Sequence, residues 1–501
     1  MSKTLKDAPV LVVGAGIMGA GIAQVAAQAG HSVQLFDTRD GAAEQAKNKL
    51  AQTLQGLTAK GKLSAEAVAQ TLSRITTITA LEEAAGVGLV VEAIVEKLDA
   101  KRGLFQQLEA VVAADCVLAT NTSSISVTAI ANGLQYPARL VGMHFFNPVP
   151  LMKLVEVVSG LQTDAAVAAA IFELSKDWGK VPVHARSTPG FIVNRIARPY
   201  YAETLALLQE QAATPAVLDA CLRAAGFRMG PCELMDLIGH DTNFSVTQSV
   251  FEANFYDKRF VPSLVQRELV DGGLLGRKSG RGFYDYANGV TTPELEKVAP
   301  VQLPTTQLLR VHGQGPVADR WAAALKQAEQ VFLRVPNSDW VGLGVEGAQL
   351  RLTDGRTATE LGVEVAVFDL PLNMTSGATL AWAPSLHASA SWASGAPQWL
   401  AALGFKPQRL ADAPGLVVAR TIAMLINEAA DAVQQGVCTP DGANAAMKLG
   451  VNYPAGPFEW LAGWNTNAVV RLLDALDLRY RGERYRVSPW LRQRSHQETS
   501  V

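Results

Sequence analysis

Cysteine is scarce in this sequence, and no cysteine lies in a pattern that binds metal. The 501 residues include four cysteines, none of which belongs to a C-x-x-C motif or has histidines at a zinc-ligand spacing. We therefore expect neither a metal site nor a disulfide framework. Scattered cysteines fit a reducing compartment, and the N-terminus lacks a signal-peptide pattern, so we expect a cytoplasmic protein.

Long apolar runs and an excess of one charge are also missing. No apolar stretch reaches about 18 residues without a charge or a turn residue, so we expect no membrane span. Lysine and arginine together number 44 against 46 acidic residues, and this balance does not point to nucleic acid as a partner. Apolar residues make up 49% of the chain, which is ample for the buried cores of about two to four domains.

The first third of the chain alternates between apolar strands and helices. The expected strands lie at 9–14, 32–37, 75–80 and 87–94 and within "CVLATNTSS" and "RLVGMHFFNP". Helices are expected between them, including 18–30, which is closed by Gly30, and long helices over 42–72. Such alternation predicts a parallel, doubly wound sheet.

A glycine-rich loop joins the first strand to the first helix. The stretch "GAGIMG" at 14–19 has the spacing G-x-G-x-x-G, and Asp37 ends the next strand. In this context the motif is the dinucleotide-binding fingerprint. Gly14 allows the tight turn, Gly16 lets the backbone approach a pyrophosphate, and Gly19 lets helix and strand pack closely.

Asp37 indicates which dinucleotide binds. A carboxylate there accepts hydrogen bonds from the ribose hydroxyls and repels a 2′-phosphate, so NAD is favoured over NADP. Arg39, two residues later, weakens that preference slightly. FAD shares the same fingerprint, so the loop alone does not identify the reaction.

Three polar side chains that could take part in a reaction lie within or just after later strands. Ser123 lies in "NTSS", His144 ends the strand "RLVGMH", and Glu156 lies in "KLVEVV". Oxidation of an alcohol by NAD needs a base, and histidine changes protonation near neutral pH. Strand alternation allows Glu156 to lie beside His144 and to stabilise its charged form. The alternatives are a buried structural pair and, for Ser123, a helix N-cap, a role open also to Ser124 or Ser126.

The helical segment after residue 190 occurs twice. Residues 191–285 read as helices, about 287–405 as short strands, and helices follow again. Pro189, Gly190, Arg195, Glu203, Gly230, Pro231 and Glu233 recur, to within one residue of spacing, as Pro414, Gly415, Arg420, Glu428, Gly456, Pro457 and Glu459. Asn194, on the first long helix of this segment, becomes Ala419 in the second copy, which suggests a role beyond packing.

The expected fold is therefore an α/β Rossmann-type NAD domain followed by an all-α domain, a degenerate α/β insert and a second copy of the all-α domain. The expected boundaries are 1–186, 187–286, 287–405 and 406–501. The insert lacks a G-x-G-x-x-G loop, so we expect it to bind no NAD.

Together these residues resemble the L-3-hydroxyacyl-CoA dehydrogenase family. The matching stretches are "VVGAGIMGAGIA", "VVEAIVEKLDAK", "ATNTSSISVTAIA", "HFFNPVPLMKLVEVV", "TPGFIVNRIARPYYAE" and "GRKSGRGFYDY". The resemblance implies that His144 is the catalytic base with Glu156 as its partner, and that Ser123 and Asn194 hold the substrate. It also implies a set of NAD contacts: Gly14, Gly16, Ile17, Met18, Gly19, Asp37, Glu92, Lys97, Ser123, Asn147 and Lys278.

An acyl-CoA substrate needs cations for its phosphates. The resemblance implies that Thr53 and Lys60, with Ser123, contact coenzyme A, and the 42–62 segment also carries Lys47, Lys49 and Lys62. A solvated charged helix face is the alternative. Arg195, Arg198 or Arg228 could bind a carboxylate on the acyl tail, or could form surface ion pairs.

The second half resembles long bacterial members of the family. That group includes the 3-hydroxyadipyl-CoA dehydrogenases of phenylacetate catabolism and 3-hydroxybutyryl-CoA dehydrogenases. The duplicated helical domain implies an intramolecular pseudo-dimer, with a homodimer also open. Two other functions stay open from the sequence: oxidation of a free hydroxy acid such as L-gulonate, and a catalytically silent NAD-binding structural protein.

Overall fold

The structure is a computed structural model that describes residues 5–84, 86–287, 295, 297 and 308–499. The chain divides into two compact units. The first unit comprises residues 1–195 and 432–451, and the second comprises 196–431 and 452–501. Most of the first twenty residues of the predicted insert lie outside the described residues. The four predicted domain boundaries stay a prediction.

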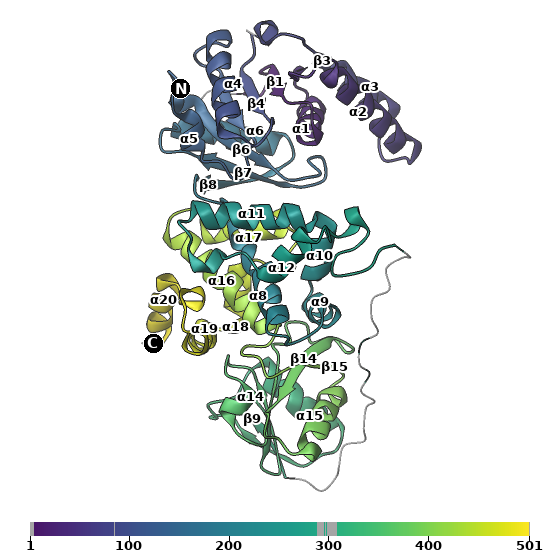
Figure 1. Cartoon of the computed structure of the whole chain (residues 1–501), viewed down its shortest axis with the longest axis vertical. Coiled ribbons are helices and arrows are strands. Elements are labelled where there is room, and N and C mark those ends of the chain that lie inside the picture. The colour runs from purple at the N-terminus through teal and green to yellow at the C-terminus, as the bar shows by residue number, and fades with distance from the viewer. Residues whose placement is uncertain (1–4, 85, 288–294, 296, 298–307, 500–501) are drawn as a thin grey trace. The chain divides into compact units, whose positions relative to one another are not determined.

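A single eight-stranded sheet forms the centre of the first unit (Figure 1). Its order is β3-β2-β1-β4-β5-β6-β7-β8, and every neighbouring pair is parallel except β6 and β7. The strands are β1 (Val10–Val13), β2 (Val33–Phe36), β3 (Ile75–Thr77), β4 (Leu89–Glu92), β5 (Val117–Thr120), β6 (Leu140–Phe145), β7 (Leu154–Ser159) and β8 (Val181–Arg186). The first six strands have the order of a dinucleotide-binding fold, which confirms the predicted doubly wound sheet.

Apolar strands and small-residue helices form the core of this unit. Strands β1, β4 and β5 are buried along their whole length, as expected for a sheet covered on both faces. The helices are α1 (Ile17–Gln28), α2 (Ala42–Ala59), α3 (Ala65–Ser73), α4 (Leu98–Val111), α5 (Val127–Ala131) and α6 (Ala165–Asp177). Helices α2 and α3 lie side by side and project from the sheet (Figure 1).

The predicted duplication is visible helix by helix. The first copy contains α8 (Arg198–Gln209), α9 (Pro215–Ala224), α10 (Pro231–Ile238), α11 (His240–Ala253) and α12 (Leu264–Asp271). The second copy contains α16 (Val418–Gln434), α17 (Pro440–Gly450), α18 (Pro457–Trp464), α19 (Thr466–Tyr480) and α20 (Pro489–Thr499). Helix α17 belongs to the first unit, where it contacts β7 and β8.

The backbone repeats as well as the helices. Gly190 and Phe191 have φ values of 76° and 48°, and Gly415 and Leu416 at the corresponding positions have 71° and 53°. A left-handed conformation is unfavourable for phenylalanine and leucine. Its recurrence in both copies shows that the turn before the first helix is a conserved part of the repeated unit.

The helix that carries Asn194 is shorter than the sequence suggests. The prediction of one long helix is wrong, because α7 spans only Val193–Ile196 and α8 begins after a break. Pro199 causes this break, since it has no N–H for the carbonyl four residues earlier and its ring crowds that carbonyl. In the second copy Met424 stands at the corresponding position, and α16 runs without a break from Val418 to Gln434.

The insert in the second unit contains a seven-stranded mixed sheet of order β10-β9-β11-β12-β13-β14-β15. Its strands are β9 (Leu309–His312), β10 (Phe332–Val335), β11 (Gly342–Val345), β12 (Ala348–Leu352), β13 (Val365–Phe368), β14 (Thr379–Pro384) and β15 (Lys406–Arg409), and its helices are α13 (Pro316–Gln327), α14 (Ala358–Leu361) and α15 (Ala390–Ala402). The last four strands pair parallel, antiparallel and parallel, as β5 to β8 do. This half of the insert therefore repeats the second half of the first sheet.

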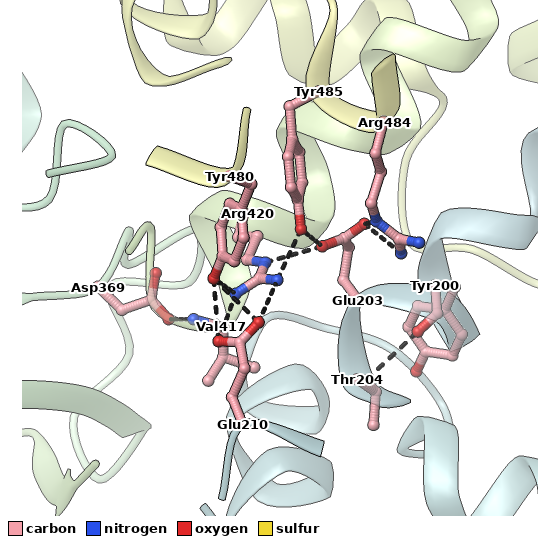
Figure 2. A network of polar contacts seen from close by, with 10 residues as sticks. All are labelled: Tyr200, Glu203, Thr204, Glu210, Asp369, Val417, Arg420, Tyr480, Arg484 and Tyr485. Carbon is pink, nitrogen blue, oxygen red and sulfur yellow. Dashed lines mark hydrogen bonds and ion pairs between the residues drawn. The ribbon is translucent and has the colours of Figure 1, made fainter. Parts of the chain in front are cut away.

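A buried guanidinium joins the two helical copies inside the second unit (Figure 2). Arg420 of α16 donates from Nε to Glu203 of α8 over 2.7 Å, and from its terminal nitrogens to Glu210 and to the Tyr485 hydroxyl. Arg484 donates to the other oxygen of Glu203 over 2.8 Å. The side chains of Arg420 and Glu203 are both 0% exposed. Two cations thus share one carboxylate where the copies meet.

Burial alone would raise the pKa of Glu203, but the charges of Arg484 and Arg420 outweigh it and hold this pKa below the usual range of a glutamate. A lowered folded-state pKa means that the ionised carboxylate stabilises the fold at neutral pH. That contribution is lost as the pH falls through the lowered pKa.

Replacing Arg420 tests the importance of this contact. We expect Arg420→Met to lower the free energy of unfolding at pH 7 by about 3–5 kcal/mol, because it removes one cation from a buried carboxylate. The matched control is Arg492→Met, which removes an ion pair with Asp474 at the exposed surface and should cost less than about 1 kcal/mol. Denaturant unfolding followed by circular dichroism measures both. Equal losses in the two variants would contradict the account.

Candidate active site

The glycine loop has the geometry that its sequence predicts. Gly14 has a φ of +103°, and a Cβ there would lie 2.5 Å from the carbonyl oxygen of Ala93. A Cβ on Gly19 would lie 1.7 Å from the carbonyl oxygen of Gly14, so only glycine lets α1 pack this closely. Gly16 is the N-cap of α1, and a Cβ there would meet nothing within 4 Å. The open side of Gly16 leaves the helix N-terminus accessible to a phosphate.

Asp37 closes the loop from the end of the next strand. Its carboxylate accepts hydrogen bonds from the N–H of Ala15 over 2.8 Å and from the backbone and guanidinium of Arg39. Burial would raise the pKa of Asp37, but the hydrogen bonds from Arg39 and Ala15 lower it below the ordinary aspartate value. The carboxylate is therefore ionised, and it can accept hydrogen bonds from the hydroxyls of a ribose.

A cleft follows this loop along the sheet edge, and its lining fits the adenosine half of NAD. The lining includes glycines that suit the phosphates, a carboxylate that suits the ribose and several apolar side chains: Val13, Gly14, Gly16, Asp37, Thr38, Arg39, Ala93, Ile94, Val95, Asp99, Ala100, Gly103, Leu104 and Gln107. Ile17 and Met18 begin α1 beside it, and the side chain of Ile17 is exposed.

The predicted histidine–carboxylate pair is present in the first unit. The antiparallel register of β6 and β7 places His144 opposite Glu156, with Nδ1 2.6 Å from Oε2. Both side chains are buried. An ionised carboxylate can only accept, so Nδ1 donates to it and the neutral ring keeps its lone pair on Nε2. Phe146 and Phe191 lie against the ring, with centroids 4.5 and 5.8 Å away.

The other oxygen of Glu156 holds the segment that carries Asn194. Oε1 accepts hydrogen bonds from the N–H groups of Ile192 and Val193, over 3.1 and 2.9 Å. The Asn194 amide nitrogen in turn lies 3.4 Å from the carbonyl oxygen of Ser123, to which it donates. Hydrogen bonds from Glu156 to His144 and to the backbone just before Asn194, and from Asn194 to the Ser123 backbone, thus connect the segments that carry the four residues predicted to be catalytic.

Ser123 does not serve as a helix cap. The N-cap of α5 is Ser126, whose hydroxyl accepts a hydrogen bond from the N–H of Ala129. Ser123 instead lies in a tight segment after β5, where its N–H donates to Glu96 over 2.8 Å. The structural alternative for Ser123 is thereby removed.

Lys101 and Glu96 lie beside this segment, and neither was identified from the sequence as a residue of the site. Lys101 is 1% exposed, and its Nζ lies 2.6 Å from Glu92 and 3.2 Å from Glu96. A signal was available, because Lys101 occupies a position on the buried face of α4 otherwise held by Leu104, Phe105 and Leu108. A lysine inside an apolar helical stripe indicates a buried carboxylate partner.

Glu92, a predicted NAD contact, is buried, and its carboxylate accepts three hydrogen bonds from within the protein. It is 0% exposed and accepts from Lys101, from the Thr120 hydroxyl and from the N–H of Ile94. Through the N–H of Ile94 it holds the backbone of a residue that lines the cleft. Direct contact with NAD stays a prediction.

The other predicted cofactor and CoA residues lie at exposed positions. Asn147 and Lys97 are exposed in the first unit. Thr53 lies on α2, where its hydroxyl donates to the carbonyl of Lys49, and Lys60 is the exposed C-cap of that helix. Lys278 belongs to the second unit and forms an ion pair with Asp241.

Two arginines considered as surface residues are buried. Arg195 is 3% exposed and donates to Gln435 over 2.7 Å, and Arg198 is 5% exposed and donates to the Thr247 hydroxyl. The surface ion-pair alternative is therefore wrong for both. Arg228 is exposed.

Among the described residues, no group of three or more His, Cys, Asp or Glu side chains is arranged to hold a metal ion. Within that same part of the chain, no helix is both long and apolar enough to cross a membrane.

Three family models match the chain. The 3-hydroxyacyl-CoA dehydrogenase NAD-binding domain matches residues 9–188, and the C-terminal domain of the same family matches twice, at 190–286 and 415–499. The 3-hydroxybutyryl-CoA dehydrogenase reduced Rossmann-fold domain matches residues 350–414. These matches confirm the duplication and the degenerate dinucleotide fold of the insert.

Similar proteins cover almost the whole chain. The 3-hydroxyadipyl-CoA dehydrogenase of Escherichia coli K12 is 44% identical over 97% of both chains. A probable 3-hydroxybutyryl-CoA dehydrogenase of Deinococcus radiodurans is 43% identical over 55% of this chain and 99% of its own. The crystal structure of a 3-hydroxybutyryl-CoA dehydrogenase from E. coli K12 matches with a TM-score of 0.89, at 42% identity and over 99% of both chains.

The shorter relative matches only the first part of this chain, whereas the E. coli proteins match it from end to end. The full-length matches therefore include the insert and the second helical copy. With its NAD-binding domain, its repeated C-terminal domain and these full-length relatives, the chain belongs to the 3-hydroxyacyl-CoA dehydrogenase family.

Proposed function

We propose that this chain catalyses the NAD-dependent oxidation of an L-3-hydroxyacyl-CoA to the 3-oxoacyl-CoA. One observation carries the proposal: the buried His144–Glu156 pair is connected through α7 to Asn194 and Ser123, within the unit that holds the glycine loop. A structural ion pair does not require a link to the Asn194 amide and, through it, to the Ser123 backbone. The relatives named above are dehydrogenases of 3-hydroxyacyl-CoA substrates by name, so neither the free hydroxy acid nor the silent structural protein gains support.

In this mechanism NAD, when bound, supplies the hydride acceptor, and the chain supplies the base. His144 takes the proton of the 3-hydroxyl at Nε2, while Nδ1 keeps its hydrogen bond to Glu156. The carboxylate of Glu156 stabilises the resulting positive ring and fixes its orientation. Ser123 binds the 3-oxygen, and Asn194 orients the thioester end of the substrate. Phe146 and Phe191 keep water from the ring.

We propose 3-hydroxyadipyl-CoA as the substrate. The support is the E. coli 3-hydroxyadipyl-CoA dehydrogenase, which aligns with this chain over 97% of both lengths. 3-Hydroxybutyryl-CoA is the alternative, because the similar E. coli structure and the D. radiodurans protein are both named as 3-hydroxybutyryl-CoA dehydrogenases. A role in phenylacetate catabolism would follow from the first substrate.

We also propose that the two helical copies form a pseudo-dimer within one chain, in place of the interface between two short chains. The buried contacts of Arg420 with Glu203 support it. A homodimer of this long chain stays compatible with that arrangement. Four cysteines without disulfide partners support a cytoplasmic location.

His144→Gln tests the proposed base. We expect kcat for oxidation to fall by about 10²–10⁴-fold, because glutamine cannot accept the hydroxyl proton. The matched control is His184→Gln, a histidine exposed on β8 of the same sheet, which should retain wild-type kcat. Steady-state formation of NADH with L-3-hydroxybutyryl-CoA measures both variants. Wild-type turnover by His144→Gln with every acyl-CoA would refute the assignment.

Asp37→Ser tests the choice of cofactor. Removing the carboxylate frees Arg39 to bind a 2′-phosphate, so the ratio of kcat/KM for NAD over NADP should fall by about 10–100-fold. Asp40→Ser changes an exposed neighbour and should leave that ratio unchanged. An unchanged ratio in Asp37→Ser would show that another residue selects the cofactor.

A substrate profile tests the acyl-CoA and the proposed CoA contacts. We expect the highest kcat/KM with 3-hydroxyadipyl-CoA, and no oxidation of the corresponding free hydroxy acids. Lys60→Ala should raise the KM for acyl-CoA several-fold and leave the KM for NAD unchanged, because it removes a cation near the CoA phosphates. Turnover of free L-gulonate at a rate comparable to that of acyl-CoA would overturn the proposal.

A further inference from the structure

A small cavity lies beside α8 within the second unit, and two arginines line it. Its volume is about 80 Å³, and its polar lining includes Arg198, Thr247, Ser263, Gln266 and Arg484. Among the described residues that line it, none is an aspartate or a glutamate. At roughly 30 Å³ for each water molecule, the cavity has room for two or three waters or for one small anion.

The duplication supplies a second version of this region for comparison. Arg484 corresponds to Arg259 of the first copy, at the spacing that relates Glu428 to Glu203. Both arginines lie in a short 3-10 helix, and in both copies the backbone two residues before that helix is left-handed. Each arginine also pairs with the other copy, Arg259 with Glu428 of α16 and Arg484 with Glu203 of α8. Such reciprocal contacts are those of an isologous interface, so the surroundings of the two arginines can be compared position by position.

The surroundings of Arg259, which we call the Arg259 site, contain three carboxylates. The guanidinium pairs with Asp257 over 2.9 Å, with Glu428 over 3.4 Å and with Asp431. Asp431 pairs also with Arg486 over 2.9 Å. Burial would lower the pKa of Arg259, but the carboxylates outweigh it and raise this pKa above the ordinary arginine value. The buried cation of this site is thus compensated by side chains of the protein itself.

The corresponding surroundings of Arg484 have lost two of these carboxylates. Arg484 pairs with Glu203 over 2.8 Å through one terminal nitrogen, and Figure 2 shows its other terminal nitrogen directed away from that carboxylate. Ala206 stands at the position that corresponds to Asp431, and Gly482 at the position that corresponds to Asp257. Ala206 and Arg484 both line the cavity. By this correspondence, the cavity opens where the Arg259 site has the carboxyl group of Asp431.

The cavity contains a second cation. Arg198 is 5% exposed and donates to the Thr247 hydroxyl over 3.0 Å. Burial lowers the pKa of Arg198 below the ordinary arginine value, opposite to the shift at the Arg259 site. Glu203, the carboxylate that pairs with Arg484, is shared with Arg420. Positive charge therefore exceeds negative charge around this cavity.

We propose that this cavity binds a small free carboxylate of about the size of acetate, in the place that the Asp431 carboxyl has at the Arg259 site. Its two oxygens accept hydrogen bonds from the guanidinium groups of Arg198 and Arg484, whose N–H groups match a carboxylate in geometry and charge. The bound acid stabilises the contact between the two helical copies, because it compensates cations that are buried there. The alternative is a cavity that holds water alone.

Ala206→Asp tests the inference because it restores the missing carboxyl group from the side of the protein. In buffer without carboxylates we expect it to raise Tm by about 2–4 °C, since the new charge faces two guanidinium groups. The matched control is Ala324→Asp, at a half-buried alanine of α13 that packs against the apolar core of the insert. That variant should lower Tm, because its carboxylate replaces a methyl group among apolar side chains. Differential scanning calorimetry measures both.

Acetate is the probe for binding. Calorimetric titration of the wild-type protein with sodium acetate, at constant pH and ionic strength, should show one saturable site with Kd on the order of 0.1–1 mM, within the affinity that so small a ligand can reach. Ala324→Asp should bind acetate as the wild type does, and Ala206→Asp should bind it at least about 10-fold more weakly. Arg198→Ala, which copies Ala423 of the second copy, should show the same loss.

Sodium phosphate and sodium chloride separate a carboxylate site from a general anion site. Acetate should bind at least about 10-fold more tightly than either. Phosphate binding as tight as that of acetate, no saturable binding of acetate, or a Tm of Ala206→Asp that falls as in Ala324→Asp would each overturn the inference. If Ala206→Asp does not fold, the loss of acetate binding in Arg198→Ala decides the question.

Turnover shows whether a free acid or the acyl chain occupies the cavity. The titration needs no turnover, so a failure of the proposed dehydrogenase activity leaves the inference intact. Ala206→Asp should keep the wild-type KM for 3-hydroxyadipyl-CoA, measured by formation of NADH. A KM raised for this dicarboxylic substrate, with an unchanged KM for L-3-hydroxybutyryl-CoA, would assign the cavity to the end of the acyl chain and overturn the proposal of a free acid.

Discussion

The buried carboxylate of Glu156 connects the proposed base to the segment that carries Asn194, because its two oxygens hold different elements. Oε2 accepts from His144 over 2.6 Å and so leaves the second ring nitrogen with a lone pair. Oε1 accepts from the N–H groups of Ile192 and Val193, just before and at the start of α7, the short helix that brings Asn194 to the carbonyl of Ser123. A buried carboxylate needs hydrogen-bond partners on both oxygens, and these three contacts fix the histidine and the start of the helix together. One carboxylate thus fixes both the proposed base, His144, and the amide proposed to bind substrate, Asn194.

The duplicated half shows which part of this constraint belongs to the fold and which to the chemistry. Asp369 follows β13 in the insert, and its carboxylate accepts from the N–H groups of Val417, Val418 and Ala419. Those positions correspond to Ile192, Val193 and Asn194. A buried carboxylate therefore holds the turn before the first helix in both copies. In the second copy both of its oxygens bond backbone, and Ala419 replaces the amide. The anchoring persists there without the proposed catalytic side chains.

Strand periodicity and glycine spacing account for what was predictable from the sequence. Both depend on local geometry, so the glycine loop, the doubly wound sheet, the duplication and the His144–Glu156 pair could be predicted residue by residue. The break before α8 depends on Pro199, a local signal that the prediction of one long helix did not include. Glu96 and Lys101 were missed for a different reason. Their importance comes from contacts with backbone N–H groups of a distant segment, and such contacts leave no spacing pattern in the chain. The burial of Arg195 and Arg198 likewise depends on tertiary packing.

The central claim is that the ring of His144, held by Glu156, faces the 3-oxygen of an acyl-CoA. The most direct test is a crystal structure of the protein with NADH and a 3-oxoacyl-CoA such as acetoacetyl-CoA. The account predicts Nε2 of His144 and the hydroxyl of Ser123 within about 2.6–3.2 Å of the 3-oxygen, the reach of a hydrogen bond that transfers a proton. A 3-oxygen bound away from both groups, or a ring whose Nε2 contacts only protein, would contradict it.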